Sequence, residues 1–343
     1  MTHAQRGKAL TLLEGVGGAA GLLLAVPAQP STGVKLRNGG TFRIALNVNP
    51  GGVDSIDPAL PGAPSKGMVL RPTCAQLMAF PGPKPEVSAG YPKRSPDRRT
   101  YTFTIRKGFR FNTGEPVTAQ SYARAITRFL SPAMRVEDVA ELAERFVGGR
   151  AFNEGTELKL RGVAATGRTL VFRLTRPWPH LPYELATPTL FCPVPARLPI
   201  VAEGAPLPGS GPYYVSRFVP GRKIVLARNR LYRGSRPQHV DRFDVDLTST
   251  LETTTQRVIQ GRADFAIAAA SQFKPLGRRY GINRRRFFTF LSPESGPRIL
   301  ALNSRRGLFR NNAALRRAVN SRSTGRHWQR CSTAKPCCRL TTF

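Results

Sequence analysis

Tyr101-Thr102-Phe103-Thr104-Ile105-Arg106 alternates aromatic or aliphatic with polar side chains, a pattern that predicts a β-strand with one buried face. The alternation ends at Asn112-Thr113-Gly114. Shortly afterwards Thr118 can cap a helix, which we expect from Ala119 to Leu130 because apolar residues recur there at helical spacing. A strand that leads into an amphipathic helix indicates a mixed α/β chain.

The same alternation predicts further strands on both sides of this unit. They are expected near residues 41–46, 163–165, 170–174, 213–215, 223–227, 243–247 and 265–267. Short helices are expected at 181–186 and from Thr253 to Gln260. Proline recurs between 177 and 208, which favours a loop-rich connection there.

Composition bounds the number of domains and the kinds of partner. With 343 residues the chain exceeds the usual size of one hydrophobic core, so we expect two lobes. It carries 53 Lys and Arg against 20 Asp and Glu, a net charge of +33 that attracts anions and nucleic acid at low salt. The arginines are spread along the chain, and runs such as Arg284-Arg285-Arg286 fit either a nucleic-acid contact or a solvated cationic surface.

The first 28 residues have the pattern of an export signal. Arg6 and Lys8 precede a mostly apolar stretch from Ala9 to Ala25, and small residues around Ala28 suit a cleavage site. We therefore predict a signal peptide over 1–28 and an exported protein. An N-terminal helix that is retained is the alternative.

Cys74 and Cys192 lie within patterned sequence and are our candidates for a disulfide, because an exported chain meets oxidising conditions. Two buried free thiols remain the alternative. The remaining cysteines, Cys331, Cys337 and Cys338, have no partner residues at zinc-finger spacing.

Motifs for catalysis are not found in the sequence. A nucleophile elbow, a phosphate loop, paired zinc histidines and a dinucleotide fingerprint are all missing, and the four histidines are scattered. We predict that the chain is not an enzyme and has no catalytic residue, cofactor or metal site.

A series of short motifs resembles the extracellular solute-binding proteins of peptide- and nickel-type ABC transporters, bacterial solute-binding family 5. The motifs occur in the family's order over about residues 38–320: Gly39-Gly40-Thr41-Phe42-Arg43-Ile44, Ile56-Asp57-Pro58, Ser95-Pro96-Asp97 leading to the stretch 101–108, Phe111-Asn112-Thr113-Gly114-Glu115-Pro116-Val117-Thr118-Ala119, Gly209-Ser210-Gly211-Pro212-Tyr213, Arg228-Asn229-Arg230-Leu231-Tyr232-Arg233-Gly234 and Gly261-Arg262-Ala263-Asp264. Turn and cap residues dominate these motifs, which favours scaffold roles.

The resemblance implies a periplasmic-binding-protein-like fold of type II, with two lobes and an extra inserted subdomain. Residues 39–58 and 161–268 would form the first lobe, 59–160 the inserted subdomain, and 269–320 the start of an incomplete second lobe. Residues 321–343 depart from the family pattern as an aberrant tail. We interpret this as a truncation or frameshift that impairs binding, with an unusual natural terminus as the alternative.

The resemblance also implies a function. The chain is expected to bind a small solute, an oligopeptide first, and to deliver it to the membrane permease of an ABC importer. It would act as a monomer in the periplasm or at the outer face of the cytoplasmic membrane. The lobes would close about a hinge near Asp264 to Ala270. A basic nucleic-acid- or anion-binding protein is the alternative.

Three residues are candidates for ligand contact. Asp54 and Ser55 lie in the loop that follows the first strand, where a carboxylate can bind a peptide ammonium group, and Arg298 can take a peptide carboxylate from the facing side. Asp54 as a turn residue and Arg298 as a surface charge are the competing interpretations.

Overall fold

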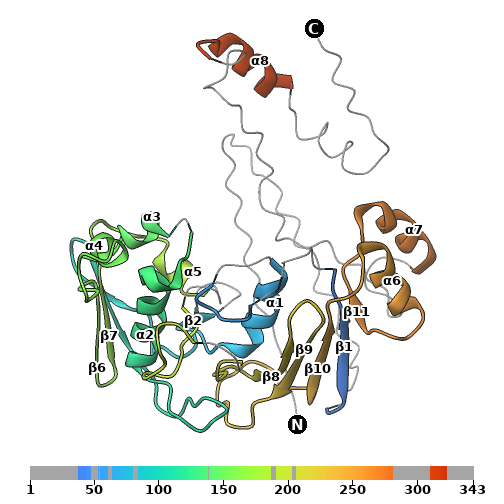
Figure 1. Cartoon of the computed structure of the whole chain (residues 1–343), viewed down its shortest axis with the longest axis horizontal. Helices are drawn as coiled ribbons and strands as arrows, with labels where there is room; N and C mark the ends of the chain where they lie inside the picture. Colours follow the sequence, from blue (N-terminus) through green and yellow to red (C-terminus); the bar gives the residue numbers. More distant parts are fainter. Residues whose placement is uncertain are drawn as a thin grey trace, which may run out of the picture. The chain divides into compact units, whose positions relative to one another are not determined.

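A five-stranded sheet contains the first strand that the sequence predicts. In the computed structural model its strands follow the order β11-β1-β10-β9-β8 (Figure 1). Strand β1 is parallel to β10 and β11, whereas β9 is antiparallel to both β10 and β8. The strands are β1 (Thr41–Ala45), β8 (Tyr213–Val219), β9 (Lys223–Arg228), β10 (Arg242–Asp246) and β11 (Phe265–Ala266).

The structure describes most of the chain between residues 38 and 280. The described residues are 38–47, 53, 55–60, 64–79, 84–137, 139–186, 191–202, 206–280 and 310–322. The expected signal peptide, and the part of the expected tail from residue 323 onward, lie outside them. Residues 38–343 belong to one unit, which is the one described here.

A second, four-stranded sheet is antiparallel throughout, in the order β4-β5-β7-β6. Its strands are β4 (Lys93–Arg94), β5 (Thr100–Thr104), β6 (Val163–Thr166) and β7 (Thr169–Arg173). This pairing differs from the expected boundary at residue 160, because β6 and β7 belong with β5 and not with the five-stranded sheet. The physical reason is packing, since Phe172 of β7 lies against Phe103 of β5 at a ring-centroid distance of 5.6 Å.

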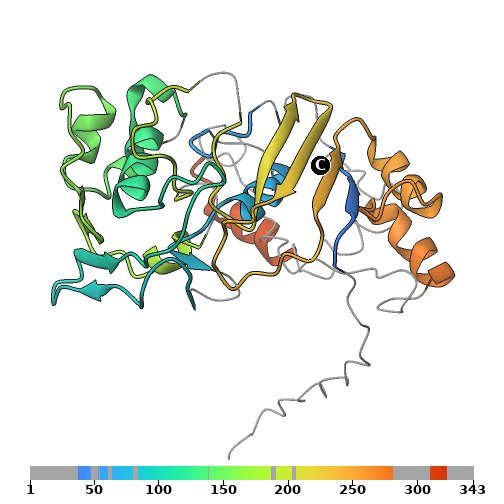
Figure 2. The same cartoon turned by 90° about the horizontal axis from the view of Figure 1, so that it is seen from below.

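Helix α2 (Ala119–Leu130) has the predicted bounds and packs on β6 and β7. Figures 1 and 2 both place α6 (Leu251–Ile259) beside β1 and β11. The other elements are α1 (Pro64–Thr73), β2 (Met78–Ala79), β3 (Lys84–Pro85), a 3-10 turn η1 (Pro132–Met134), α3 (Ala140–Ala143), α4 (Gly149–Asn153), α5 (Leu181–Glu184), α7 (Ala270–Tyr280) and α8 (Ala313–Arg322). None of the helices described is long and apolar enough to cross a membrane.

Two apolar cores support the two sheets. The larger one joins α2 to the inner face of the four-stranded sheet through buried aromatic side chains such as Tyr101 and Phe172. The smaller one lies on the five-stranded sheet and includes Val53 and Ile56 from the loop after β1. Burial of these two side chains fixes the loop that the sequence singles out for ligand contact.

Candidate functional site

The loop after β1 carries two of the candidate residues. Ser55 is half-buried, and its Oγ accepts a hydrogen bond from the Asp57 N–H at 3.1 Å. Asp57 Oδ1 in turn accepts the Ala59 N–H at 2.9 Å. These bonds shape a turn, so Ser55 already has a structural partner. Asp54 and Arg298 lie outside the described residues, and their ligand contacts remain predictions.

Asp57 anchors this loop through a buried ion pair that was not predicted from the sequence. Its two carboxylate oxygens bind Arg128 of α2, with Nη1–Oδ1 at 3.1 Å and Nη2–Oδ2 at 2.6 Å. Arg128 Nε also donates to the carbonyl oxygens of Pro199 and Ile200, at 3.0 and 2.7 Å. The Arg128 side chain is 0% exposed. One guanidinium therefore joins the loop, α2 and the segment at 199–200.

Lys66 of α1 holds the same loop from a second side. Its Nζ donates to the carbonyl oxygens of Asp57 and Leu60, at 2.7 and 2.6 Å, and the residue is buried. Burial lowers the pKa of Lys66 to about 8, although the nearby negative charge of Asp57 acts in the opposite direction. The ammonium group of Lys66 thus supplies hydrogen-bond donors to two carbonyl oxygens of a tight loop.

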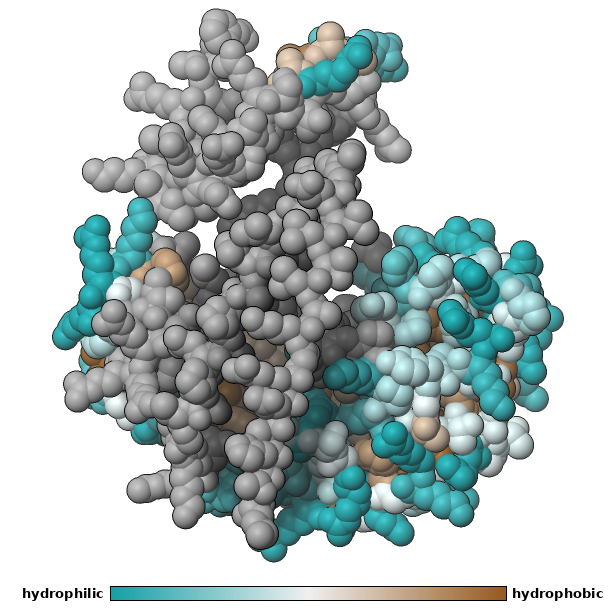
Figure 3. All heavy atoms as spheres, turned by 180° about the vertical axis from the view of Figure 1, so that it is seen from behind, coloured by the Kyte–Doolittle hydropathy of each residue, from teal (hydrophilic) through white to brown (hydrophobic). Residues whose placement is uncertain are grey.

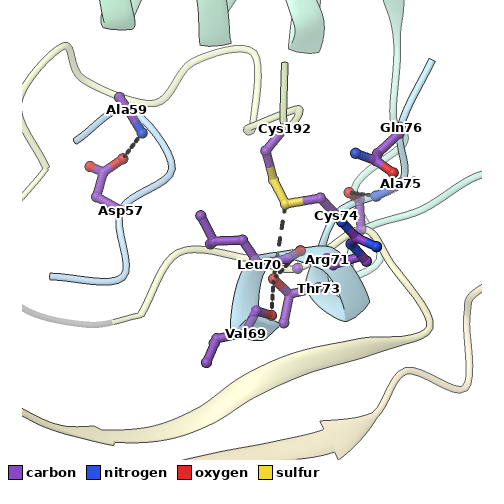
Figure 4. Close-up of a disulfide and its surroundings, with 12 residues drawn as sticks. Asp57, Ala59, Val69, Leu70, Arg71, Thr73, Cys74, Ala75, Gln76 and Cys192 are labelled. Atoms are coloured by element: carbon purple, nitrogen blue, oxygen red, sulfur yellow. Dashed lines mark hydrogen bonds between the residues drawn. A yellow bond between two sulfur atoms is a disulfide. The ribbon is translucent and has the colours of Figure 1, made fainter. Parts of the chain in front are cut away.

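A disulfide joins Cys74, directly after α1, to Cys192 in the structure (Figure 4). The Cα atoms are 5.2 Å apart, and Leu70 packs against the bridge. The segment 191–200 is therefore tied to the rest of the chain by both the disulfide and Arg128.

The Gly209-Ser210-Gly211-Pro212 motif packs on the same end of α1. Ser210 Oγ accepts the Ala75 N–H at 2.9 Å, and the N–H groups of Ser210 and Gly211 donate to the Thr73 carbonyl oxygen. A Cβ at Gly211 would lie 2.4 Å from the Pro72 carbonyl oxygen. Only glycine fits this approach, so the motif is a joint between the β8 segment and α1.

A buried carboxylate forms another joint around the Arg-Asn-Arg-Leu-Tyr motif. Glu86 Oε1 accepts hydrogen bonds from Tyr232 Oη at 2.7 Å and from Arg236 Nε at 2.8 Å. Arg236 also donates to the carbonyl oxygens of Arg71 and Cys74. Burial, with the charge of Glu86, raises the pKa of Tyr232 to about 12, so the phenol stays protonated as a donor.

Asp264 ties the start of the expected hinge to β1. Its carboxylate accepts the Arg43 N–H at 2.7 Å and binds the Arg43 guanidinium, with Nη2–Oδ1 at 2.9 Å. Hydrogen bonding to Arg43 lowers the pKa of Asp264. The hinge assignment remains a prediction.

Only a weak sequence signal marks Arg128 as a buried residue. On α2 it follows Ser121 and Ala125 at helical spacing, along a stripe of small buried residues that leaves room for a long side chain. The buried polar side chains described above bond to one another or to backbone groups, and these bonds hold the loop and the joints. Within the described part of the chain, no group of three His, Cys, Asp or Glu side chains could hold a metal ion.

Comparison with known proteins places these motifs in a family. Residues 82–321 match the model for the bacterial extracellular solute-binding proteins, family 5 Middle. Protein XP55 of Streptomyces lividans is 29% identical over 230 residues, which cover 62% of this chain and 36% of that protein. The dipeptide-binding protein DppE of Bacillus subtilis is 28% identical over 183 residues, 51% of this chain and 33% of DppE.

Solved structures agree with the fold. The clavulanic acid biosynthesis oligopeptide binding protein 2 superposes with a TM-score of 0.56 at 27% identity, over 66% of this chain and 43% of that one. The Escherichia coli murein tripeptide binding protein MppA gives 0.62 at 23% identity, over 72% and 49%. The fold is therefore the mixed α/β fold of the periplasmic peptide-binding proteins.

The curated relatives are longer than the region that matches. The alignments cover between 33% and 41% of the length of each relative. Four of these relatives are named as binding proteins, and none of the four is named as an enzyme. Because the family model matches well over half of the sequence, the chain belongs to the bacterial extracellular solute-binding proteins, family 5.

Proposed function

We propose that this chain captures a small solute, with an oligopeptide as the first candidate, and delivers it to the permease of an ABC importer. The family match over residues 82–321 carries the proposal, and relatives named as dipeptide- and oligopeptide-binding proteins support the choice of ligand. Members of this family work outside the cytoplasm. We place this chain there too, as an exported monomer that is periplasmic or lies at the outer face of the cytoplasmic membrane.

The loop at 53–57 supplies the first-lobe contacts in this proposal. Asp54 would bind the peptide ammonium group and Ser55 a neighbouring polar group, while Arg298 would take a carboxylate from the facing side. The buried pair of Asp57 with Arg128, together with Lys66, supports the proposal because it fixes the loop before a ligand arrives. A loop that is already ordered loses less conformational entropy when it binds.

Calorimetry with a mixture of di- to pentapeptides tests this assignment. The Asp54→Asn variant removes the charge but keeps the size, and we expect it to weaken binding by about 10- to 100-fold, as for one charge-assisted hydrogen bond. Asp97→Asn is the matched control, because Asp97 is an exposed turn residue of the four-stranded sheet. Equal affinities for the two variants would remove Asp54 from the site, and no heat with any peptide would count against the peptide assignment.

A further inference from the structure

The outer face of the four-stranded sheet is polar and open within the described structure. Alternation turns Tyr101 and Phe103 toward α2, whereas Thr100 and Thr102 lie on the opposite face. Lys93 pairs with Thr102, and Arg173 with Thr100, so both cations share that outer face. No other described helix or strand packs extensively against it.

Cations gather at one end of this sheet, where the β4–β5 turn meets the end of β7. We call this cluster the basic sheet end. All its members are exposed, and no ion pair within the described structure involves any of them. It consists of Lys93, Arg94, Arg98, Arg99, Arg173 and Arg176.

Acidic side chains barely offset this charge. Asp97 is the only acidic residue in the described stretches 91–110 and 161–176. Its Oδ1 accepts hydrogen bonds from Ser95 Oγ and the Arg99 N–H, so this carboxylate is already hydrogen-bonded within the turn. Glu144 lies next to Thr175, beside Arg176, but its carboxylate binds Arg150, which also pairs with Glu154. With six cations and one nearby carboxylate in these stretches, the basic sheet end carries a net positive charge.

We propose that the basic sheet end docks on the anionic phospholipid headgroups of the membrane. The proposal rests on the proposed function, which places the chain at a membrane surface. Charge complementarity supports it, since basic residues near an anionic bilayer each increase partitioning about fivefold. The side of the molecule that carries this sheet is largely hydrophilic in Figure 3.

Two features favour lipid over nucleic acid as the partner. Tyr91 is 67% exposed and lies two residues before β4, where an aromatic ring can rest at the headgroup level. The outer sheet face itself presents threonine and valine side chains, which offer no ring on which successive bases could stack. A polar face with cations at one end suits an anionic surface.

The test compares two triple variants of the full chain. Arg94→Gln, Arg99→Gln and Arg173→Gln remove three charges from the basic sheet end. Arg217→Gln, Arg222→Gln and Arg230→Gln remove three exposed arginines from the five-stranded sheet and its flanking turns, as a matched control. Sedimentation with phosphatidylglycerol–phosphatidylcholine vesicles, at about 0.15 M salt to limit unspecific attraction, measures partitioning. Circular dichroism checks that both variants fold.

We expect the first triple variant to lose partitioning on the order of 100-fold and the control to lose less than about fivefold. Equal losses, or equal binding to pure phosphatidylcholine vesicles, would overturn the proposal. Tighter binding of a single-stranded oligonucleotide that depends on the same three arginines would also overturn it, in favour of nucleic acid. Peptide calorimetry on the first variant should be unchanged, so the solute-binding proposal fails or holds separately.

Discussion

Two aspartates from the sequence motifs bind arginines in very different surroundings. Asp57 and Arg128 have side chains that are 10% and 0% exposed, whereas those of Asp264 and Arg43 are 31% and 46% exposed. Both pairs have short hydrogen bonds, and each connects segments that are far apart in the sequence. Short ion-pair contacts thus occur both in a buried pair, Asp57 with Arg128, and in a solvent-exposed pair, Asp264 with Arg43.

The difference lies in what remains when one partner is lost. Arg128 gives Nη1 and Nη2 to Asp57 and its Nε to two carbonyl oxygens. Without Asp57 a guanidinium stays buried with half of its partners missing, which is costly. Arg43 without Asp264 can turn to water, and salt screens the pair even when it is intact.

The largest expected effect concerns the disulfide, which holds the segment 191–200 together with Arg128. Replacing both Cys74 and Cys192 by Ala should lower the free energy of unfolding by about 4–5 kcal/mol in the chain-entropy model, because the bridge closes a long loop. Urea unfolding measures the loss. A reductant should bring the wild-type chain to the value of the variant and leave the variant unchanged.

Mass analysis of non-reduced peptides provides the direct check of this pairing. Free thiols at both positions would contradict it. Without the bridge, Arg128 would still connect this segment to the loop, because it binds Asp57 and the carbonyl oxygens of Pro199 and Ile200.

The next effect should come from Asp57→Asn, which keeps the shape of the side chain but leaves Arg128 without its counter-charge. We expect a loss of about 3–5 kcal/mol in the free energy of unfolding, again from urea titration. Combining it with Arg128→Met removes the buried guanidinium charge that has no counter-charge. The double variant should therefore lose less free energy of unfolding than Asp57→Asn alone. A double variant that is as unstable as the sum of both changes would show that the charge is not what matters.

The pH dependence of stability tests whether the second buried cation near this loop, Lys66, is held in a poorly solvated site. Its pKa falls from 10.5 to about 8 on folding, so between these values only the unfolded chain binds the proton. Stability relative to Lys66→Met should therefore rise with pH over this range, by up to about 3 kcal/mol at 1.36 kcal/mol per pKa unit. Urea midpoints for both chains, taken below pH 8 and above pH 10.5, measure it. A constant difference between the two chains would mean that folding leaves the pKa of Lys66 unchanged, as for a well-hydrated ammonium group.

Local signals account for what the sequence predicted well. Thr118 and the apolar spacing behind it mark α2, and alternation marks β5 and β7, because each pattern is set by neighbours in the chain. Helices α1 and α7 were not predicted, since Pro72 and Pro275 lie inside them and suggest breaks.

The support of the loop could not be predicted for a different reason. Arginine in a helix is normally exposed, and nothing near Arg128 points to Asp57, which lies 71 residues away. The motif containing Asp57 marked a turn, but its partner depends on how α2 packs. Pairings of this kind depend on tertiary structure. A single sequence therefore shows that an aspartate and an arginine are present but does not show that they are in contact.

The smallest expected effect is that of Asp264→Asn, although Asp264 accepts three hydrogen bonds from Arg43 and Asp57 only two from Arg128. Because water reaches both side chains, we expect a loss of stability that is a small fraction of that for Asp57→Asn and that shrinks as salt is added. The pKa of Asp264 is lowered in the fold, so its contribution is present above its ordinary value of 3.8 and is lost as the pH falls through the folded value. Urea unfolding of both chains at low and high salt, and at neutral and acidic pH, tests the salt and the pH dependence together. A loss as large as that of Asp57→Asn, and insensitive to salt, would mean that exposure does not separate the two pairs and that the backbone N–H of Arg43, which Asp264 also binds, decides the stability of this joint.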